Sequence, residues 1–255
     1  MDLADPRAFE LFLEIYGSLP RAGPGSTADT LRALSLVPVT EPASVLDLGC
    51  GPGAQTLVLA EALPGASILA VDLAPQMVTE ARRRVDEAGV GGRVRVEGGD
   101  LSSPPVPVFS QDLIWCEGAI YFVGVEAALR AWRPLLTDGG CVAFTELIWT
   151  DPSPPAELVS WWLAEHPDIT DEEGVRTAVR AAGFDTVGAF VLPDRSSWNE
   201  YYGPMEVRIP EFVAAHQEDP TALGIADEAT MEIDMFRRYS DCYSYGFFVV
   251  RPGVR

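Results

Sequence analysis

The sequence predicts an α/β fold: a Rossmann-like sheet of seven mostly parallel strands with helices on both faces, an N-terminal helical cover and a helical insertion before the last strand. Two observations predict it. Short β-rich segments alternate with helical ones from Ala43 to Glu146, and glycines fill the first strand–helix junction. A length of 255 residues suits one domain with additions to its core, so a single domain over residues 1–255 is expected.

Residues 1–42 are predicted to form the helical cover. Between Pro6 and Gly17 apolar residues recur at helical spacing, and the segment LPRAGPGS then breaks the helix with prolines and glycines. The recurring residues are Phe9, Phe12, Leu13 and Tyr16. A second helix is expected to begin at Ser26 or Thr27, as N-cap, and to end near Leu36.

Residues 43–147 are predicted to form the core, in which strands and helices alternate. In order, the segments are SVLDLG, AQTLVLAEAL, SILAVDL, APQMVTEARRRVDEAG, RVRVEGGD, QDLIWCEG, GVEAALRAWRPLL and CVAFTEL. Ligands of such sheets bind at the carboxyl ends of the strands. Five acidic residues lie at or just past those ends and are expected to line a common rim: Asp47, Asp72, Asp100, Glu117 and Glu146.

Residues 148–255 are predicted to complete the sheet on the substrate side. After a proline-rich stretch, a helix is expected from Asp171 to Ala182 and a strand from Phe184 to Leu192. The stretch from residue 196 to 239 is too long for a hairpin loop and is predicted as a helical insertion. The last strand, Tyr243 to Val250, is expected to be an antiparallel edge strand.

Composition excludes several classes of function. The net charge is −20, from 38 acidic residues against 18 arginines and no lysine, which disfavours nucleic acids and anionic membranes as partners. No apolar run reaches the roughly 18 residues of a membrane span, and the acidic start MDLADP does not resemble a signal peptide. A soluble, cytoplasmic protein is expected. The four cysteines and two histidines form no metal-binding pattern, so no metal is expected.

The segment VLDLGCGPGAQT is the strongest local signal. Glycine permits the positive φ of a tight turn and lets the backbone approach a ligand closely. Gly49, Gly51 and Ala54 also satisfy the dinucleotide fingerprint, and Asp72, roughly 20 residues on, is the acid that binds ribose in either class. The loop alone therefore leaves a nicotinamide- or flavin-dependent enzyme open.

Three further features separate the two classes. Asp47 would face a cationic ligand favourably but would repel a pyrophosphate. Asp100, after the third strand, could accept a hydrogen bond from the exocyclic amine of adenine. The expected antiparallel last strand also argues against a dinucleotide-dependent enzyme.

The order of these segments resembles the class I S-adenosylmethionine-dependent methyltransferases. VLDLGCGPG, AVDLAPQMVTEAR, RVEGGDLSSPP and SQDLIWCEGAIYFVG are similar to their motifs I to IV. A closer likeness, to a bacterial small-molecule group akin to the ubiquinone/menaquinone biosynthesis methyltransferases, extends over LPRAGPGS, AFTELIWT, PPAELVSWWLAEHPDI, FVLPDRSSWNEYYGP and YSDCYSYGFFVV.

The resemblance implies S-adenosyl-L-methionine as cofactor and assigns residues to it. The glycines of the loop would hold its methionine part, Asp72 its ribose, and Asp100 its adenine. Asp47 would orient the amino-acid end. Apart from the resemblance, Arg21 is a candidate for a bidentate contact with a ligand carboxylate, and a surface ion pair stays open as the alternative. The full set of predicted cofactor residues is Arg21, Asp47, Gly49, Gly51, Gly53, Gln55, Asp72, Leu73, Met77, Asp100, Leu101 and Glu117.

The resemblance further implies methyl transfer to a small molecule through a nitrogen, oxygen, sulfur or carbon nucleophile. Glu117 and Tyr121 are the candidate catalytic residues, and the candidate substrate pocket consists of Trp149, Trp198, Tyr201 and Tyr202. Aromatic residues at such spacing also occur as core packing, and this alternative stays open. A dehydrogenase using NAD(P), a non-catalytic cofactor-binding protein and a homodimer stay open as well.

Overall fold

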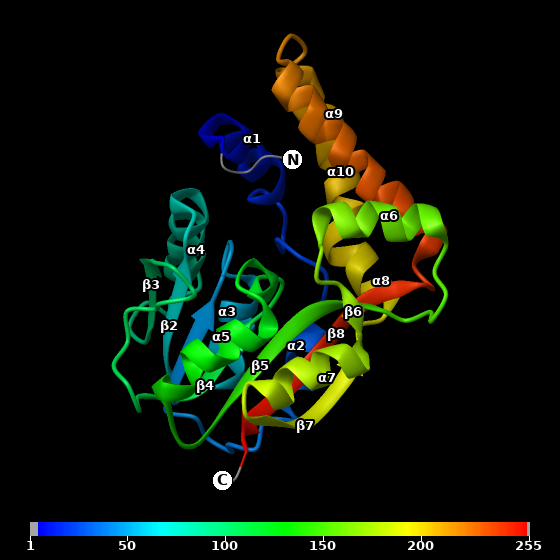
Figure 1. Ribbon diagram of the computed structural model, residues 1–255. Helices are drawn as coiled ribbons and strands as arrows, with labels where there is room; N and C mark the ends of the chain where they lie inside the picture. The colour runs from blue at the N-terminus through cyan, green and yellow to red at the C-terminus, as the bar shows by residue number, and fades with distance from the viewer. Residues whose placement is uncertain (1–4, 254–255) are drawn as a thin grey trace.

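A computed structural model of the protein describes residues 5–253. Residues 1–4, within the acidic start and the predicted cover, and residues 254–255 lie outside the described part. The centre of the fold is one twisted sheet in the order β3-β2-β1-β4-β5-β8-β7, with a short strand β6 paired to β5 (Figure 1). The strands are β1 (Ser44–Leu48), β2 (Ser67–Asp72), β3 (Val94–Gly98), β4 (Gln111–Cys116), β5 (Leu136–Trp149), β6 (Thr170–Asp171), β7 (Phe184–Val191) and β8 (Tyr243–Pro252).

The first five strands are parallel, whereas β8 runs antiparallel to both β5 and β7. This arrangement confirms the predicted Rossmann-like sheet and its antiparallel last strand. The expectation of an edge position for that strand is wrong, because β8 lies between β5 and β7, and β7 forms the edge. The physical reason is burial: the GFFVV stretch of β8 is apolar on both faces and is buried on both, as in a central strand.

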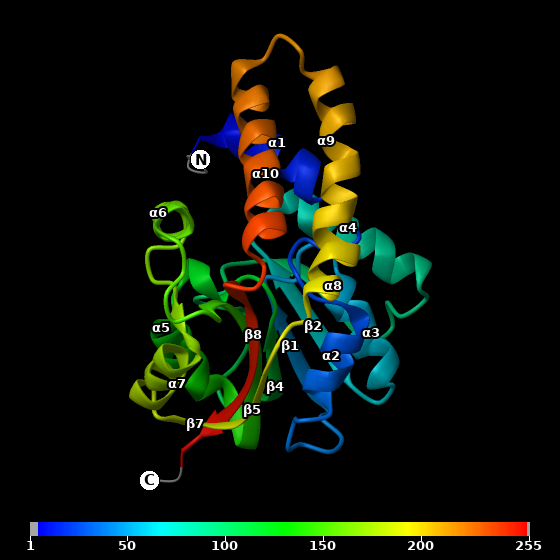
Figure 2. The ribbon, with the colours of Figure 1, turned by 90° about the vertical axis from the view of Figure 1, so that its right-hand side faces the viewer.

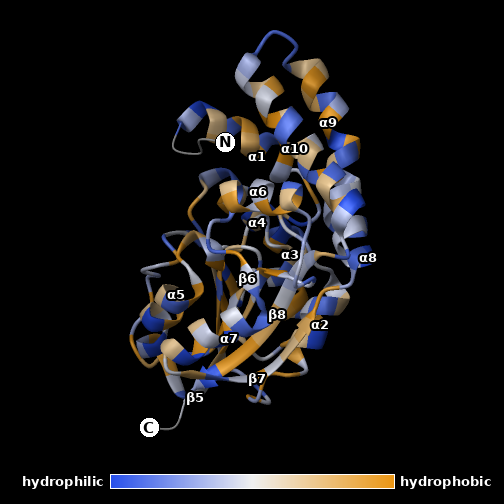
Figure 3. Ribbon diagram, turned by 45° about the vertical axis from the view of Figure 1, so that its right-hand side comes forward, coloured by the Kyte–Doolittle hydropathy of each residue, from blue (hydrophilic) through white to orange (hydrophobic). Residues whose placement is uncertain are grey.

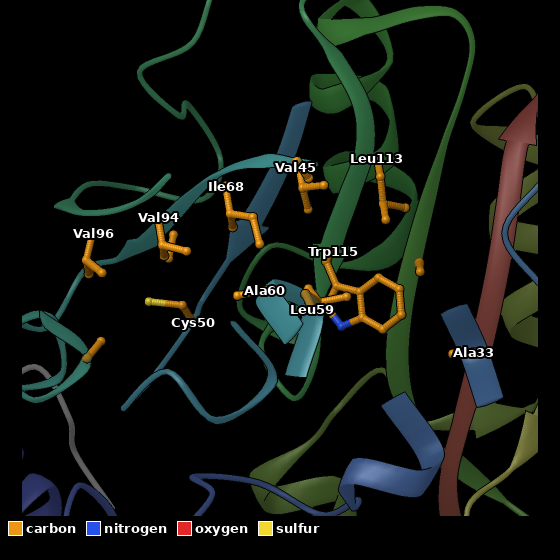
Figure 4. Packing of buried hydrophobic residues seen from close by; sticks show 14 of the residues in the cluster. Ala33, Val45, Cys50, Leu59, Ala60, Ile68, Val94, Val96, Leu113 and Trp115 are labelled. Carbon is orange, nitrogen blue, oxygen red and sulfur yellow. The ribbon is translucent and has the colours of Figure 1, made fainter. Parts of the chain in front are cut away.

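Helices cover both faces of the sheet, as Figure 2 shows with the sheet seen nearly on edge. On one face lie α2 (Thr27–Leu34), α3 (Ala54–Ala62) and α4 (Pro75–Glu87), and on the other α5 (Val125–Trp132) and α7 (Glu172–Ala181). Ser26 caps α2, since its side chain accepts a hydrogen bond from the Asp29 N–H. Figure 4 shows the first face, where Leu113 and Trp115 of β4 pack toward Leu59 of α3.

A helical cap stands at the carboxyl ends of the strands (Figures 1 and 2). It combines α1 (Pro6–Tyr16) with α6 (Ala156–Glu165), α8 (Asp194–Ser197), a π-helical turn (Trp198–Tyr202), α9 (Gly203–Ala215) and α10 (Pro220–Tyr239). Buried side chains of α1, α9 and α10 share one apolar cluster, including Leu11, Phe212 and Ile233. Figure 3 shows apolar residues along β7 and β8 beneath helices of mixed polarity. None of the described helices is long and apolar enough to cross a membrane.

Candidate functional site

The glycine loop joins β1 to α3 and bends sharply over the edge of the sheet. Gly49, Gly51 and Gly53 have φ angles of 66°, 52° and 87°, which favour glycine. The N–H groups of Gly49 and Cys50 both donate to the carbonyl of Val71 in β2. A Cβ on Gly49 would lie 2.3 Å from the Cβ of Ala119, so the chain beyond β4 closes directly over this turn.

Asp72 ends β2 and holds the loop in place. One of its carboxylate oxygens accepts from the Gly51 N–H at 2.8 Å and the other from the Ala74 N–H at 2.9 Å. Burial raises the pKa of this carboxyl, against the lowering effect of those backbone donors. The carboxylate thereby connects the glycine loop to the start of α4 and lies at the predicted rim.

Asp47 lies beneath the loop and is fully buried. Its oxygens accept from Thr56 Oγ1 at 2.5 Å and from Gln55 Nε2 at 3.3 Å. Burial raises its pKa to about 7, although the two hydrogen bonds act in the opposite direction. The structure therefore places Asp47 as a support for the first turn of α3, behind the residues that face the cavity.

A cavity of about 690 Å³ opens at the carboxyl ends of β1, β2 and β4. Its wall contains most of the predicted cofactor residues together with Tyr121: Arg21, Gly49, Gly51, Gln55, Asp72, Leu73, Met77, Asp100, Leu101 and Glu117. Asp47 and Gly53 are not in this wall, and Gly53 instead packs against Ala81 of α4. Among the acids of the predicted rim, Glu146 also lies outside the wall.

Glu117 and Arg21 form a buried ion pair between the end of β4 and the N-terminal cover. Arg21 Nη1 lies 2.7 Å from Glu117 Oε2, and Thr30 Oγ1 and Trp115 Nε1 donate to the other oxygen at 2.9 and 2.7 Å. Arg21 is 4% exposed and Glu117 9%. With both oxygens engaged by donors, the geometry favours Glu117 as an anchor of the cover over Glu117 as a base.

Arg21 keeps one free donor in this arrangement. Its Nε is buried and has no hydrogen-bond partner among the residues that the structure describes. The carboxylate of Glu200 lies 3.8 Å away, beyond hydrogen-bonding distance. Arg21 lines the cavity, so its guanidinium places a positive charge in the wall, although the unpaired Nε itself is covered.

Tyr121 lies in η1 (Ile120–Phe122), and its ring is tilted by 54° to that of His166, with the ring centroids 4.4 Å apart. Although Tyr121 is 36% exposed, partial removal of its phenol from water raises the pKa, and the carboxylates of Glu232 and Glu146 add to the effect. The hydroxyl therefore stays protonated near neutral pH and is available as a donor. The carboxylates of Glu232 and Glu146 thus act electrostatically on a residue of the cavity wall.

The four predicted substrate-pocket residues are outside the wall of this cavity. Trp198 stacks on Phe236 at 6.3 Å, and Trp149 packs partly buried against the cap. Tyr201 and Tyr202 are buried in the same cluster, but the hydroxyl of Tyr201 donates to Glu232 at 3.3 Å. Their direct contact with a substrate stays a prediction.

Glu232 is the residue that sequence reasoning missed. Its two oxygens accept from Tyr16 and Tyr201, both at 3.3 Å. A signal was available, because Glu232 falls in the buried stripe of α10, seven residues after Ile225 and four before Phe236. Carboxylates are seldom buried without a compensating partner, so a glutamate at this position of the helix indicated a polar cluster.

Residues 45–140 match the family described as "Methyltransferase domain". Trans-aconitate 2-methyltransferase of Methylobacterium nodulans is 38% identical over 112 residues, which are 43% of this chain and 40% of that protein. Nocamycin O-methyltransferase of Saccharothrix syringae is 30% identical over 182 residues, which are 60% of this chain and 63% of that protein. The chain thus spans less than two thirds of these curated relatives.

A similar solved structure covers nearly the whole chain. It is a SAM-dependent methyltransferase from Geobacter sulfurreducens in complex with S-adenosyl-L-homocysteine, with a TM-score of 0.83 and 21% identity. The similar region covers 95% of this chain and 98% of the other, so the likeness includes the cap as well as the sheet. Residues 45–140 therefore match a methyltransferase domain, and the solved structure shows that the whole chain shares the fold of that methyltransferase.

Proposed function

We propose that the cavity binds S-adenosyl-L-methionine and that the protein transfers its methyl group to a small molecule. The observation that carries the proposal is the convergence of the glycine loop, Asp72 and Arg21 on one cavity of about 690 Å³. The relatives, named as methyltransferases of small molecules, support it. The comparisons do not favour the NAD(P)-dependent alternative.

The residues of the wall fit this cofactor. A Cβ on Gly49 would clash with Ala119, and glycine leaves the backbone of the loop open to a ligand. The positive charge of Arg21 in the wall suits the carboxylate of the amino-acid end, and Asp72 suits the ribose hydroxyls. Leu73, Met77 and Leu101 supply the apolar surface that an adenine ring requires.

When bound, the cofactor supplies a methyl group that is already activated by the positive charge on sulfur. The chain's own contributions are therefore orientation and the exclusion of water. Arg21 and Glu117 hold the segment between α1 and α2 against the end of β4, so that this segment forms part of the wall. The protonated hydroxyl of Tyr121 can orient an acceptor by donating a hydrogen bond.

We propose further that the protein acts in the cytoplasm on a small acceptor. All four cysteines are free, which suits a reducing compartment. A net charge of −20 repels nucleic acids and other large polyanions, so they are poor candidates for the acceptor. Glu117 and Tyr121 stay the candidate catalytic residues, with Glu117 as a positioning group and Tyr121 as a donor.

The test is binding of S-adenosyl-L-homocysteine, NADH and NADPH, measured by calorimetry. We expect micromolar binding of the first alone, and a loss of at least about tenfold in Asp72→Ala, because hydrogen bonds to a charged group contribute about 1.5–3 kcal/mol each. Asp138→Ala, at an exposed position near the start of β5, should bind like the wild type. No binding, or a preference for a dinucleotide, would reject the proposal.

A further inference from the structure

The cavity continues toward the cap into a region of different chemistry. Tyr16 of α1 and Tyr121 line it there, whereas the glycine loop and Asp72 line the other end. Behind Tyr16 lies Glu232, which is only partly accessible and is contacted from α1 and from the π-helical turn. Figure 2 shows α1 beside α10, above the carboxyl ends of the strands.

Tyrosines surround Glu232 on several elements. Tyr16 and Tyr201 donate to its two oxygens, one to each. Burial raises the pKa of Glu232 to about 7, while the phenolic donors oppose this effect. The titratable groups that act on it, or on which it acts, are Tyr16 on α1, Tyr121 on η1, Glu165 on α6, Tyr201 and Tyr202 on the π-helical turn, and Tyr243 and Tyr245 on β8.

A second carboxyl, that of Glu146 in β5, acts electrostatically on Tyr121. Glu146 is 9% exposed, accepts a hydrogen bond from the Leu147 N–H and has a pKa raised by burial to about 7. Glu146 and Glu232 both act on the hydroxyl of Tyr121. Among the described residues, neither carboxylate has an arginine or histidine within 4.0 Å.

Both carboxyls gain from a cation placed nearby. An ionised carboxylate removed from water is costly, so without a positive charge its pKa rises, whereas a cation favours the ionised form. The chain does provide arginine to its other buried acid, since Glu117 pairs with Arg21. The faces of tyrosine rings also attract ammonium groups, most strongly where water is excluded.

We infer that the end of the cavity lined by Tyr16 and Tyr121, with Glu232 hydrogen-bonded behind Tyr16, binds a cationic group of the acceptor, so that the acceptor belongs to the amines or quaternary ammonium compounds. The inference rests on the proposed function, because it assigns the acceptor side of the same cavity. The cation would lie against the rings of Tyr16 and Tyr121, and the negative charge of Glu232 behind Tyr16 would add to the attraction.

The test compares two probes of the same shape, choline and 3,3-dimethyl-1-butanol, which differ by the charge at one atom. Binding is measured by NMR titration of the full-length protein with saturating S-adenosyl-L-homocysteine. We expect choline to bind at least about tenfold more tightly than the neutral probe. Equal binding of the two, or binding of the alcohol alone, would overturn the inference, and this comparison in the wild type requires no variant.

Variants then assign the preference to Glu232. Glu232→Gln should reduce the preference for choline to less than about threefold, while Asp227→Asn, at an exposed position of the same helix, should leave it unchanged. Both variants should bind S-adenosyl-L-homocysteine like the wild type, which shows that they are folded. Failure of that ligand to bind the wild type would count against the proposed function, whereas its binding without a choline preference would reject the cationic acceptor alone.

Discussion

Replacement of Arg21 by methionine tests whether the ion pair with Glu117 holds the N-terminal cover on the sheet. Methionine keeps an apolar side chain of similar length but removes the guanidinium. Glu117 would then stay buried with two neutral donors, Thr30 and Trp115. We expect a large loss of stability and a loosened segment between α1 and α2.

The magnitude follows from the burial of both partners. The side chains of Arg21 and Glu117 are 5% and 4% exposed, and removal of one partner from such a pair costs about 3–5 kcal/mol. The two remaining donors place the expected cost near the lower end, at about 3 kcal/mol. Glu117→Gln combined with Arg21→Met leaves no uncompensated charge, so the double variant should be more stable than the sum of the single effects predicts, by about 1–3 kcal/mol.

The assay is urea unfolding followed by tryptophan fluorescence and circular dichroism. Arg130→Met serves as control, because Arg130 pairs with Glu126 through side chains that are 59% and 46% exposed, and loss of that pair should cost less than about 1 kcal/mol. An Arg21→Met protein within about 1 kcal/mol of the wild type would refute the anchor. Strict additivity in the double variant would refute the assigned pairing.

Two further predictions concern the loop and the cap. Gly49→Ala should weaken S-adenosyl-L-homocysteine binding in calorimetry by more than about tenfold, because its Cβ would meet Ala119, whereas Gly89→Ala, at a similar φ with no neighbour within 4 Å, should bind normally. For Glu232, a folded-state pKa near 7 lies above the unfolded value, so its contribution to stability is complete below about pH 4 and is lost as the pH rises toward 7. In urea unfolding, Glu232→Gln should therefore gain about 1–3 kcal/mol relative to the wild type between pH 5 and 8, and parallel pH curves for the two proteins would contradict this assignment.

The cofactor half of the site was predictable because its residues are local in sequence. The glycine loop, Asp72 and Asp100 each follow a strand of the parallel core, and parallel strands bring their carboxyl ends to one edge. The sequence could not show which of these side chains reach the cavity and which are enclosed behind its wall. Asp47 follows the same rule of position, but Thr56 and Gln55 of α3 enclose its side chain behind the cavity wall.

The edge position expected for β8 was wrong for a related reason. Its position along the chain suggests that the last strand pairs at an edge of the sheet. A strand is instead stable where its apolar faces are buried. β7 exposes several of its side chains, including Val187 and Val191, whereas the middle of β8 is buried on both sides. The continuous apolar run of β8, residues 247–250, was visible in the sequence and is typical of a strand buried on both faces.

The acceptor half depends on contacts between distant segments. Tyr16, Tyr121, Tyr201 and Glu232 belong to four elements separated by up to 216 residues, and they meet only when α1 packs on the hairpin of α9 and α10. No periodicity in one segment predicts such a meeting, and only the carboxylate in the apolar stripe of α10 indicated that a polar site lay there. The two halves are therefore under different constraints: the sheet fixes the loop at the proposed cofactor end of the cavity, while substitutions in the cap can change the proposed acceptor end without disturbing that loop.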